Sequence, residues 1–319
     1  MLFRSLATSG GTVTIANNIV LNSLNLVNAF VTNLGPVSSG NITVSGVISG
    51  SSDLNIAGGD AGTFRGGGSG TLTLNQQNTY TGATTINLTG TSAVKLGVSN
   101  ALPPGTALSF GTNSSASGSI LDLNGHDQTV DSLASGGIGV ASNYKITNKG
   151  GVDSTFTVNG ATISANAFGG IISDGIANKI ALVKAGSGML ALSGANTYSG
   201  GTTLSGGTLN VNADAALGAL TGGVAMSNGA TLQTGASVTS NRAFTLGTGG
   251  GVIDTNGFSM TFDTVGSVSG TTTRPERARI AAARSSRVEL PWPMISRSRE
   301  GPKTWMRSML RFASVRVSG

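Results

Sequence analysis

Short runs in which apolar and polar residues alternate recur through most of this chain. Examples are Thr12–Ile15 (TVTI), Asn41–Val44 (NITV) and Thr155–Val158 (TFTV). A two-residue period places one set of side chains on each face of a strand, which is typical of a half-buried β-strand. Glycine, asparagine or aspartate interrupts these runs every several residues, and no window keeps a 3.6-residue period. The pattern therefore predicts many short strands, with Asn212–Leu217 as the one stretch that suits a helical turn.

Two segments of the chain are near copies. Aligned from Gly68 and Gly186, they share eleven of nineteen residues at a constant offset of 118, including the words Asn78-Thr79-Tyr80 and Asn196-Thr197-Tyr198. Internal repetition at this level is typical of solenoids, in which no unit can bury its apolar face alone. We expect repeat copies near residues 68–111 and 186–233.

Each copy predicts a strand, a turn and a second strand. The L-x-L pairs alternate with small polar residues, so their leucines should point into a shared core. In the turn, Gly82 and Gly200 are available for positive φ. At about 20–25 residues per turn, the body would hold roughly eleven to thirteen turns. The leucines that we expect to face inward are Leu72, Leu74, Leu190, Leu192, Leu204 and Leu209.

The second copy carries a family resemblance. Residues 188–202 (GMLALSGANTYSGGT) resemble the autotransporter-associated β-strand repeat of passenger domains in bacterial type V secreted proteins. Related words recur at Leu121–Gly125, Ala216–Gly218 and Ile253–Gly257, so the resemblance covers roughly residues 40 to 270. It implies a right-handed parallel β-helix, displayed outside the cell or on the bacterial surface and anchored by a translocator barrel that this chain lacks.

The composition excludes several kinds of site and membrane segment. The chain has 50 glycines among 319 residues and no cysteine, which excludes disulfides and thiolate metal sites. The start holds no apolar run long enough for a signal peptide, so a secreted protein would need its signal upstream. No apolar stretch is long enough to span a membrane. We therefore expect no membrane insertion by this fragment.

Charge divides the chain into two parts. Residues 1–270 carry 8 Lys+Arg and 10 Asp+Glu, whereas 271–319 carry 11 and 3, which together give the net charge of +6. The excess of positive charge thus lies in residues 271–319 alone, and nucleic-acid binding is not expected of residues 1–270. We expect residues 1–273 to form the β-helical body and residues 274–319 to form a disordered Arg-rich tail.

The position of the tail suggests a reading-frame error. From the spacing of the earlier copies, we expect a third copy of the repeat to begin after Gly270. The codons for Arg274–Arg279 can be written so that reading one base earlier gives Lys-Thr-Gly-Ala-Gly-Thr, which matches the Lys184-x-Gly-x-Gly opening. We therefore hypothesise a frameshift near residue 273, with 274–319 translated out of frame.

Candidate chemistry is sparse. Asp122, Asn124 and Asp127 resemble half a calcium loop, but the bidentate glutamate that completes such loops is missing, so a turn with Asx hydrogen bonds is the preferred interpretation. His126 is the only histidine, and no G-x-S-x-G motif offers it a nucleophile, although Asp122 or Asp131 could serve as its acidic partner.

Other motifs also favour structural roles. Gly66–Gly70 lacks the βαβ context of a phosphate loop, and Gly136–Gly139 lacks the aspartate of calcium-binding nonapeptides. Tyr80 and Tyr198 should pack over a turn end with their hydroxyls in water. The body's carboxylates are scattered aspartates with no evident acid–base pair for glycoside cleavage.

These patterns lead to one functional prediction and one alternative. The chain is expected to be a non-enzymatic stalk or adhesin-like segment, with no catalytic, cofactor-binding or metal site. Its partners would be a host surface, a glycan or a sister cell's autotransporter. The alternative is a β-helix enzyme acting on polysaccharide, which clustered aspartates on adjacent turns would favour.

Overall fold

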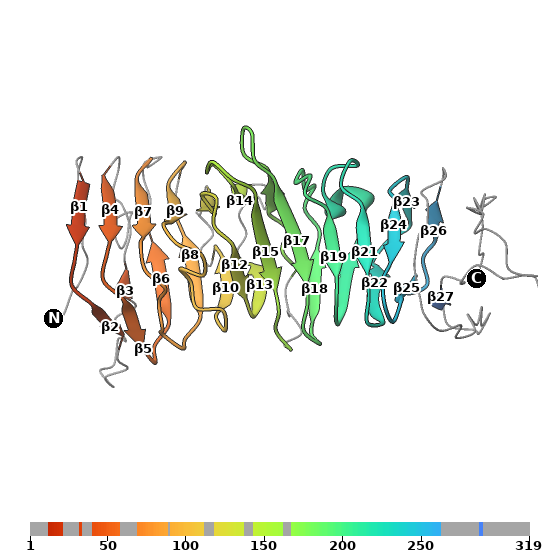
Figure 1. Cartoon of the computed structure of the whole chain (residues 1–319), viewed down its shortest axis with the longest axis horizontal. Coiled ribbons are helices and arrows are strands. Elements are labelled where there is room, and N and C mark those ends of the chain that lie inside the picture. The colour runs from red at the N-terminus through yellow and green to blue at the C-terminus, as the bar shows by residue number, and fades with distance from the viewer. Residues whose placement is uncertain are drawn as a thin grey trace, which may run out of the picture.

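The protein is an all-β rod in which short parallel strands stack along one axis (Figure 1). The computed structural model describes residues 12–21, 32–33, 40–57, 69–88, 90–111, 118–136, 143–161, 167–262 and 287–289. Within these ranges helical structure is limited to short 3-10 turns such as η2 (Asp214–Leu217). The structure confirms the parallel β-solenoid that the sequence predicts.

Four larger sheets and two strand pairs make up the walls of the rod. The seven-stranded sheet contains β1 (Thr12–Ile15), β4 (Asn41–Val44), β7 (Thr71–Leu74), β9 (Ala93–Leu96), β11 (Ser119–Asp122), β14 (Tyr144–Thr147) and β16 (Ile171–Ser173). The six-stranded sheet contains β12 (Gln128–Val130), β15 (Ser154–Val158), β17 (Ile180–Lys184), β19 (Thr202–Leu204), β21 (Val224–Met226) and β24 (Phe244–Leu246).

The remaining strands complete each turn. One five-stranded sheet contains β3 (Thr32–Asn33), β6 (Leu54–Ala57), β8 (Thr84–Asn87), β10 (Ala107–Phe110) and β13 (Ser132–Ser135). The other contains β18 (Met189–Leu192), β20 (Thr208–Val211), β22 (Ala230–Thr234), β25 (Gly251–Asp254) and β27 (Arg287–Glu289). Two pairs join β2 (Ile19–Leu21) to β5 (Ile48–Gly50), and β23 (Val238–Ser240) to β26 (Met260–Phe262).

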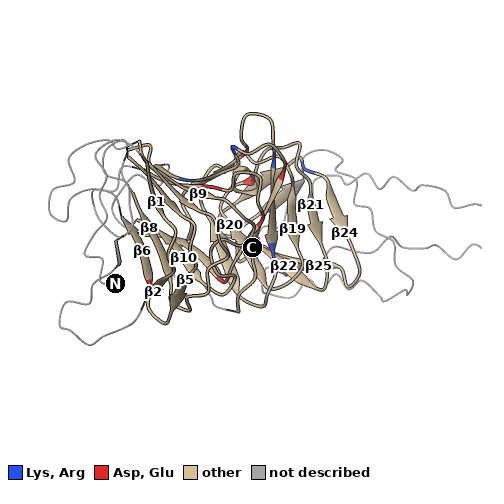
Figure 2. Ribbon diagram, turned by 60° about the vertical axis from the view of Figure 1, so that its left-hand side comes forward, with Lys and Arg blue, Asp and Glu red and all other residues tan. Residues whose placement is uncertain are grey.

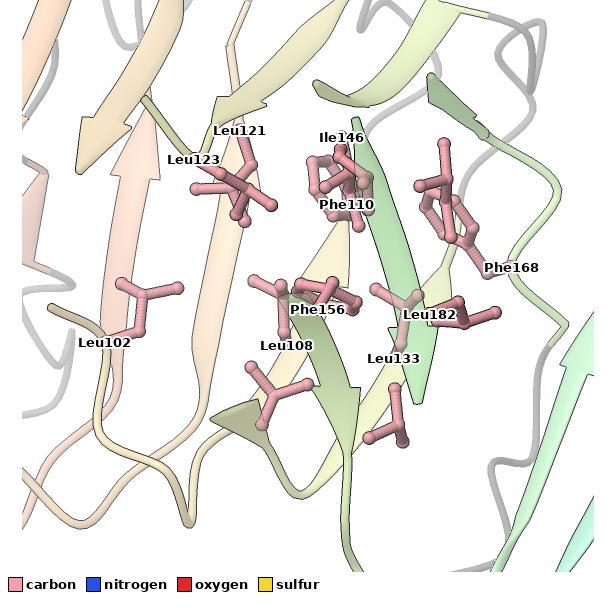
Figure 3. Packing of buried hydrophobic residues seen from close by; sticks show 14 of the residues in the cluster. Leu102, Leu108, Phe110, Leu121, Leu123, Leu133, Ile146, Phe156, Phe168 and Leu182 are labelled. Atoms are coloured by element: carbon pink, nitrogen blue, oxygen red, sulfur yellow. The ribbon is translucent and has the colours of Figure 1, made fainter. Parts of the chain in front are cut away.

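The core is a single column of apolar side chains that runs through the stack. All six leucines predicted to face inward are at most 1% exposed. Figure 3 shows leucines and phenylalanines from successive turns meeting in this column. The Phe110 ring lies with its centroid 5.5 Å from that of Phe168 and 6.3 Å from that of Tyr144. Stacked aromatic and aliphatic side chains thus fill the middle of the rod.

Turn length is less regular than the sequence suggested. The Asn41 side chain accepts a hydrogen bond from the Thr71 N–H in the next turn, 30 residues away. The Asn196 side chain donates to Ala216 O of its next turn, which is only 20 residues away. The longer spacing in the N-terminal half includes the interval between β6, which ends at Ala57, and β7, which begins at Thr71. Because many turns are this long, the described part of the rod holds fewer turns than the eleven to thirteen expected.

The two repeat copies lie on different faces of the rod. In the first copy, β7 belongs to the seven-stranded sheet. In the second copy, β18 instead continues the face of β13, with the segment at Ala167 and Phe168 between them. Ser135 N–H of β13 donates to Ala167 O, and Phe168 forms a parallel bridge with Leu192 of β18. The Asn-Thr-Tyr word of the second copy stacks on the seven-stranded sheet, because Thr197 N–H donates to Ile172 O of β16. The second copy is thus turned by one face relative to the first.

The basic tail falls almost wholly outside the described residues. Its one described piece, β27, is a strand, which the expectation of disorder did not include. It pairs antiparallel with β25, whereas the other strand pairings within the described ranges are parallel. The expected disorder of the rest of 274–319, and the frameshift hypothesis, stay predictions.

Candidate functional site

The repeated word builds a buried corner, which we call the corner cluster: Asn78, Tyr80 and Thr84 in the first copy, and Asn196, Tyr198 and Thr202 in the second. Each asparagine links three successive turns. Asn78 Oδ1 accepts from Ile48 N–H at 2.7 Å and its Nδ2 donates to Ala101 O at 2.7 Å. Asn196 repeats this with Ile172 N–H at 2.8 Å and Ala216 O at 2.7 Å. Both amides are 4% exposed, so they satisfy backbone groups that water cannot reach.

The tyrosines of the corner clusters lie inside the rod. Tyr80 and Tyr198 are 1% and 0% exposed, and their hydroxyls lie 2.6 Å and 2.7 Å from the Thr84 and Thr202 hydroxyls. Burial raises the pKa of both phenols above the ordinary value, although each threonine hydrogen bond opposes the shift. The packing expectation is confirmed, but the expectation of a hydroxyl in water is wrong, because a neighbouring threonine supplies the partner.

The repeat turn requires glycine because a side chain would clash with the neighbouring turn. Neither Gly82 nor Gly200 adopts positive φ, so that expectation is wrong. A Cβ at Gly82 would lie 2.5 Å from the backbone of Ser52 and Asp53, and one at Gly200 would lie 2.5 Å from Ile180 O. The neighbouring turn therefore passes too close for any side chain.

The calcium-loop-like motif at Asp122–Asp127 forms a turn with Asx hydrogen bonds, as the preferred interpretation held. Asp122 Oδ1 accepts from the N–H of Asn124 at 3.0 Å and of Lys149 at 2.9 Å. Asn124 and Gly125 both have positive φ, of 52° and 81°. His126 donates its backbone N–H to Leu123 O and is only partly exposed. The parallel word at Asp254–Gly257 forms the same turn, in which Asp254 accepts from Asn256 N–H at 3.0 Å.

Several other aspartates hold neighbouring turns together. Asp53 accepts from Ala83 N–H at 2.8 Å, Asp127 from Thr155 N–H at 2.6 Å, and Asp153 from Lys179 N–H at 2.7 Å. Asp174 accepts from Ile180 N–H at 2.8 Å and from the hydroxyl of Ser199 at 2.5 Å. Asp127, Asp153 and Asp174 thus lie on adjacent turns, but each carboxylate is tied to backbone donors.

No metal-binding group emerges from the part of the chain that the structure describes. Within it, no three His, Cys, Asp or Glu side chains come together as a metal would need. Asp131 contributes its backbone carbonyl to Gly160 N–H. Of the two glycine-rich words, only Ser69, Gly70 and Gly136 are among the described residues.

Two buried cations were not anticipated from the sequence. Arg242 is 1% exposed, and its Nε donates to Asp214 Oδ1 at 2.9 Å. Its other nitrogens donate to backbone carbonyls of the η2 loop, which are those of Asp214, Leu217, Gly218, Ala219 and Gly222. The guanidinium therefore holds this loop from the following turn. No local pattern near Arg242 signals the contact.

Lys184 closes a similar carbonyl cage. Its Nζ donates to the carbonyls of Ala185, Gly186 and Gly206, the last two at 3.1 Å and 3.3 Å. Burial lowers the pKa of this ammonium. The Lys-x-Gly-x-Gly opening is thus a structural feature, because the carbonyls of Ala185 and Gly186 within it turn toward the cation.

Comparisons with known proteins support the resemblance. The passenger-associated-transport-repeat family matches residues 67–91 and 182–211, which contain both Asn-Thr-Tyr words. Searches of curated proteins and of solved structures gave no significant match. Within the described residues, no helix is long and apolar enough to cross a membrane. The repeat matches and the β-solenoid together fit an autotransporter passenger repeat protein.

Proposed function

We propose that this chain, which carries two passenger-associated transport repeats within a β-solenoid, serves outside the cell or on the bacterial surface as a stalk or adhesin-like segment. The observation that carries the proposal is the unbroken column of buried apolar side chains behind outward faces rich in threonine, serine and asparagine. Such a body provides length and contact area without an active site.

The proposed stalk role needs only the stacked turns of the solenoid and the backbone hydrogen bonds between them. Each turn adds about 4.8 Å of length, so reach grows in proportion to the number of turns. The outward rows repeat at the same spacing, as Thr14, Thr43 and Thr73 do in register on β1, β4 and β7. Weak polar contacts repeated along one face add up by multivalency. The proposed partners are a host surface, a glycan or a sister cell's autotransporter.

The carboxylates support the non-enzymatic role. A glycoside hydrolase needs one carboxyl that can hold a proton beside a second that is ionised. A carboxylate that accepts a backbone N–H is held in place by that hydrogen bond. Asp127, Asp153 and Asp174 lie on adjacent turns, yet each accepts such a donor. They act as links between turns.

Surface display is the test. The chain would be fused between a secretion signal and a translocator barrel in a Gram-negative host, with whole-cell protease shaving as the readout. We expect a protease-accessible folded rod that increases adhesion to surfaces or cells and releases no sugar from polysaccharide. Retention inside the cell would contradict the localisation. Polysaccharide cleavage that Asp153→Asn abolishes would favour the enzyme instead.

A further inference from the structure

The last described turn of the rod consists of β24, β25 and β26, and a further strand covers one of its three edges. Beyond β24 and β26 the described residues place no strand. On β25, the strand β27 lies in antiparallel register, with Val252 opposite Glu289 and Asp254 opposite Arg287. Figure 1 shows β27 at the C-terminal end of the rod. We call the edge of β25 (Gly251–Asp254) that faces β27 the end edge.

The end edge would be open to other chains if nothing covered it. Alternate residues of a strand direct their N–H and C=O groups to opposite neighbours, so β22 can satisfy only one set of the β25 groups. The other set is a template for the strand of a second molecule. At the far end of the rod, β1 is the last strand of its sheet within the described residues. Because the two ends differ, stacking one rod on another would be head to tail and would build filaments.

The outer row of this sheet is a series of hydrogen-bonded side chains that ends at the end edge. Asn210 Nδ2 donates to Gln233 Oε1 at 2.8 Å, and Gln233 Nε2 donates to Asp254 Oδ2 at 3.1 Å. The other oxygen of Asp254 accepts the Asn256 N–H at 3.0 Å, which fixes the carboxylate. The row therefore ends on a negative charge, and the register places a basic residue, Arg287, at the next position. Opposite charges on directly paired residues stabilise a strand pair.

The inner row favours the same register. Its members lie in register from β18 to β25 and are at most 1% exposed, namely Leu190, Leu209, Leu232 and Ile253. Val288 lies opposite Ile253, so an apolar residue takes the next position of the apolar row. A shift by one residue would bring Arg287 or Glu289 to this row instead. The Arg-Val-Glu pattern of β27 thus matches both rows of the sheet.

We propose that β27 is a cap, which pairs with the end edge and so prevents the β1 end of a second copy of this chain from stacking there. A whole turn can stack only if its strands reach the level about 4.8 Å beyond the last turn. On one face β27 already occupies that level, and it runs opposite to the parallel strands of the rod. Solenoids need terminal caps of this kind to stay soluble.

The cap goes beyond the proposed function and does not depend on it. A rod that is not displayed on the surface would have the same end edge, so failure of the display experiment leaves the cap untouched. The cap is also independent of the origin of residues 274–319. A restored reading frame would offer a parallel turn to the edge that β27 covers in this chain.

Charge and apolar substitutions in β27 test the cap in the full-length chain. Val288→Asp places a charge on the apolar row, and Val315→Asp, the same change elsewhere in the tail, is its matched control. Arg287→Glu places a like charge opposite Asp254, with Arg297→Glu as its matched control. Circular dichroism would confirm that each variant is folded.

A double variant tests the charge pairing by rescue. Asp254→Asn combined with Arg287→Glu removes the like-charge repulsion and keeps an acceptor for Asn256 N–H. Two readouts apply to all the variants. Hydrogen exchange of residues 251–254 reports whether the end edge is covered, and sedimentation velocity with negative-stain electron microscopy reports whether rods join.

We expect Val288→Asp to raise the exchange rates of the end edge at least about tenfold, since the apolar row excludes an unpaired charge. Arg287→Glu should raise them about fivefold, as the loss of a cross-strand charge pair implies, and Asp254→Asn should partly reverse this rise. Both single variants should associate end to end as their concentration increases. The parent chain and the two control variants should stay monomeric.

Equal exchange rates for the Val288→Asp and Val315→Asp variants would show that β27 does not cover the end edge and would overturn the proposal. Loss of protection without association would overturn the capping role, because an open edge would then attract no second copy. Association of the rods side by side would do the same, since it would assign self-association to a face of the rod and not to its end.

Discussion

Asn78 and Asn196 make the same pair of interturn hydrogen bonds on two different faces of the solenoid. Each accepts a backbone N–H from the turn before it and donates to a carbonyl of the turn after it. The repeated word therefore encodes a corner rather than a particular sheet. A solenoid whose corners are interchangeable can place this word wherever consecutive turns need to be linked.

Removing one of these amides should destabilise the rod. Asn196→Ala leaves Ile172 N–H and Ala216 O buried without partners, and we expect a loss of about 2–4 kcal/mol in the free energy of unfolding. Asn210→Ala is the control, because Asn210 bonds only the side chain of Gln233 on the outer face. Urea unfolding followed by circular dichroism measures both. Similar losses for the two variants would show that the corner bonds have no special weight.

High pH should unfold the protein and ionise its tyrosines together. Burial raises the pKa of Tyr80, Tyr144 and Tyr198, and these are all the tyrosines in the chain. A phenol whose folded pKa exceeds its unfolded value of 10.0 adds stability below that pH, and this stability is lost as the pH rises above it. Absorbance at 295 nm should stay low until the circular dichroism signal collapses. Tyrosinate that forms near pH 10 in a folded rod would contradict the buried corners.

Arg242 should hold the η2 loop in place. Arg242→Ala leaves Asp214 and several carbonyls without their donor, and we expect a loss of about 3–5 kcal/mol. Arg242→Lys should recover little, because one ammonium cannot replace the planar fork that reaches so many oxygens. Hydrogen exchange of residues 214–222 would report the change locally. Unchanged protection there would show that the loop is held by other contacts.

The tail prediction is genetic. If residues 274–319 are out of frame, the gene should contain an added or missing base near codon 273. The restored frame should read Lys-Thr-Gly-Ala-Gly-Thr and continue as a further repeat. Resequencing this stretch and its downstream DNA decides the matter. An intact frame through Gly319 would mean that the Arg-rich tail is coding sequence.

The strands and their inward leucines could be predicted because period-two alternation is a local property of the chain. Tyr198 shows where local patterns end. Its turn was recognisable, but its burial depends on the covering turn and on a threonine four residues later. The role of Gly200 depends on the close approach of Ile180 O, and that of Arg242 on a loop 28 residues earlier in the chain. Contacts between turns depend on turn length, which varies and leaves no local signal.

A single pair of neighbouring substitutions tests the solenoid most directly. In β18, Leu192 is 1% exposed and faces the core, whereas Ala191 faces outward. Leu192→Asp places an unpaired charge in the apolar column and should cost several kcal/mol, about 3 or more, while Ala191→Asp should change stability by less than about 1 kcal/mol. Thermal unfolding by circular dichroism measures both. We expect a β-rich spectrum and a large drop in melting temperature for Leu192→Asp alone; equal melting temperatures, or a helical spectrum, would contradict the β-solenoid.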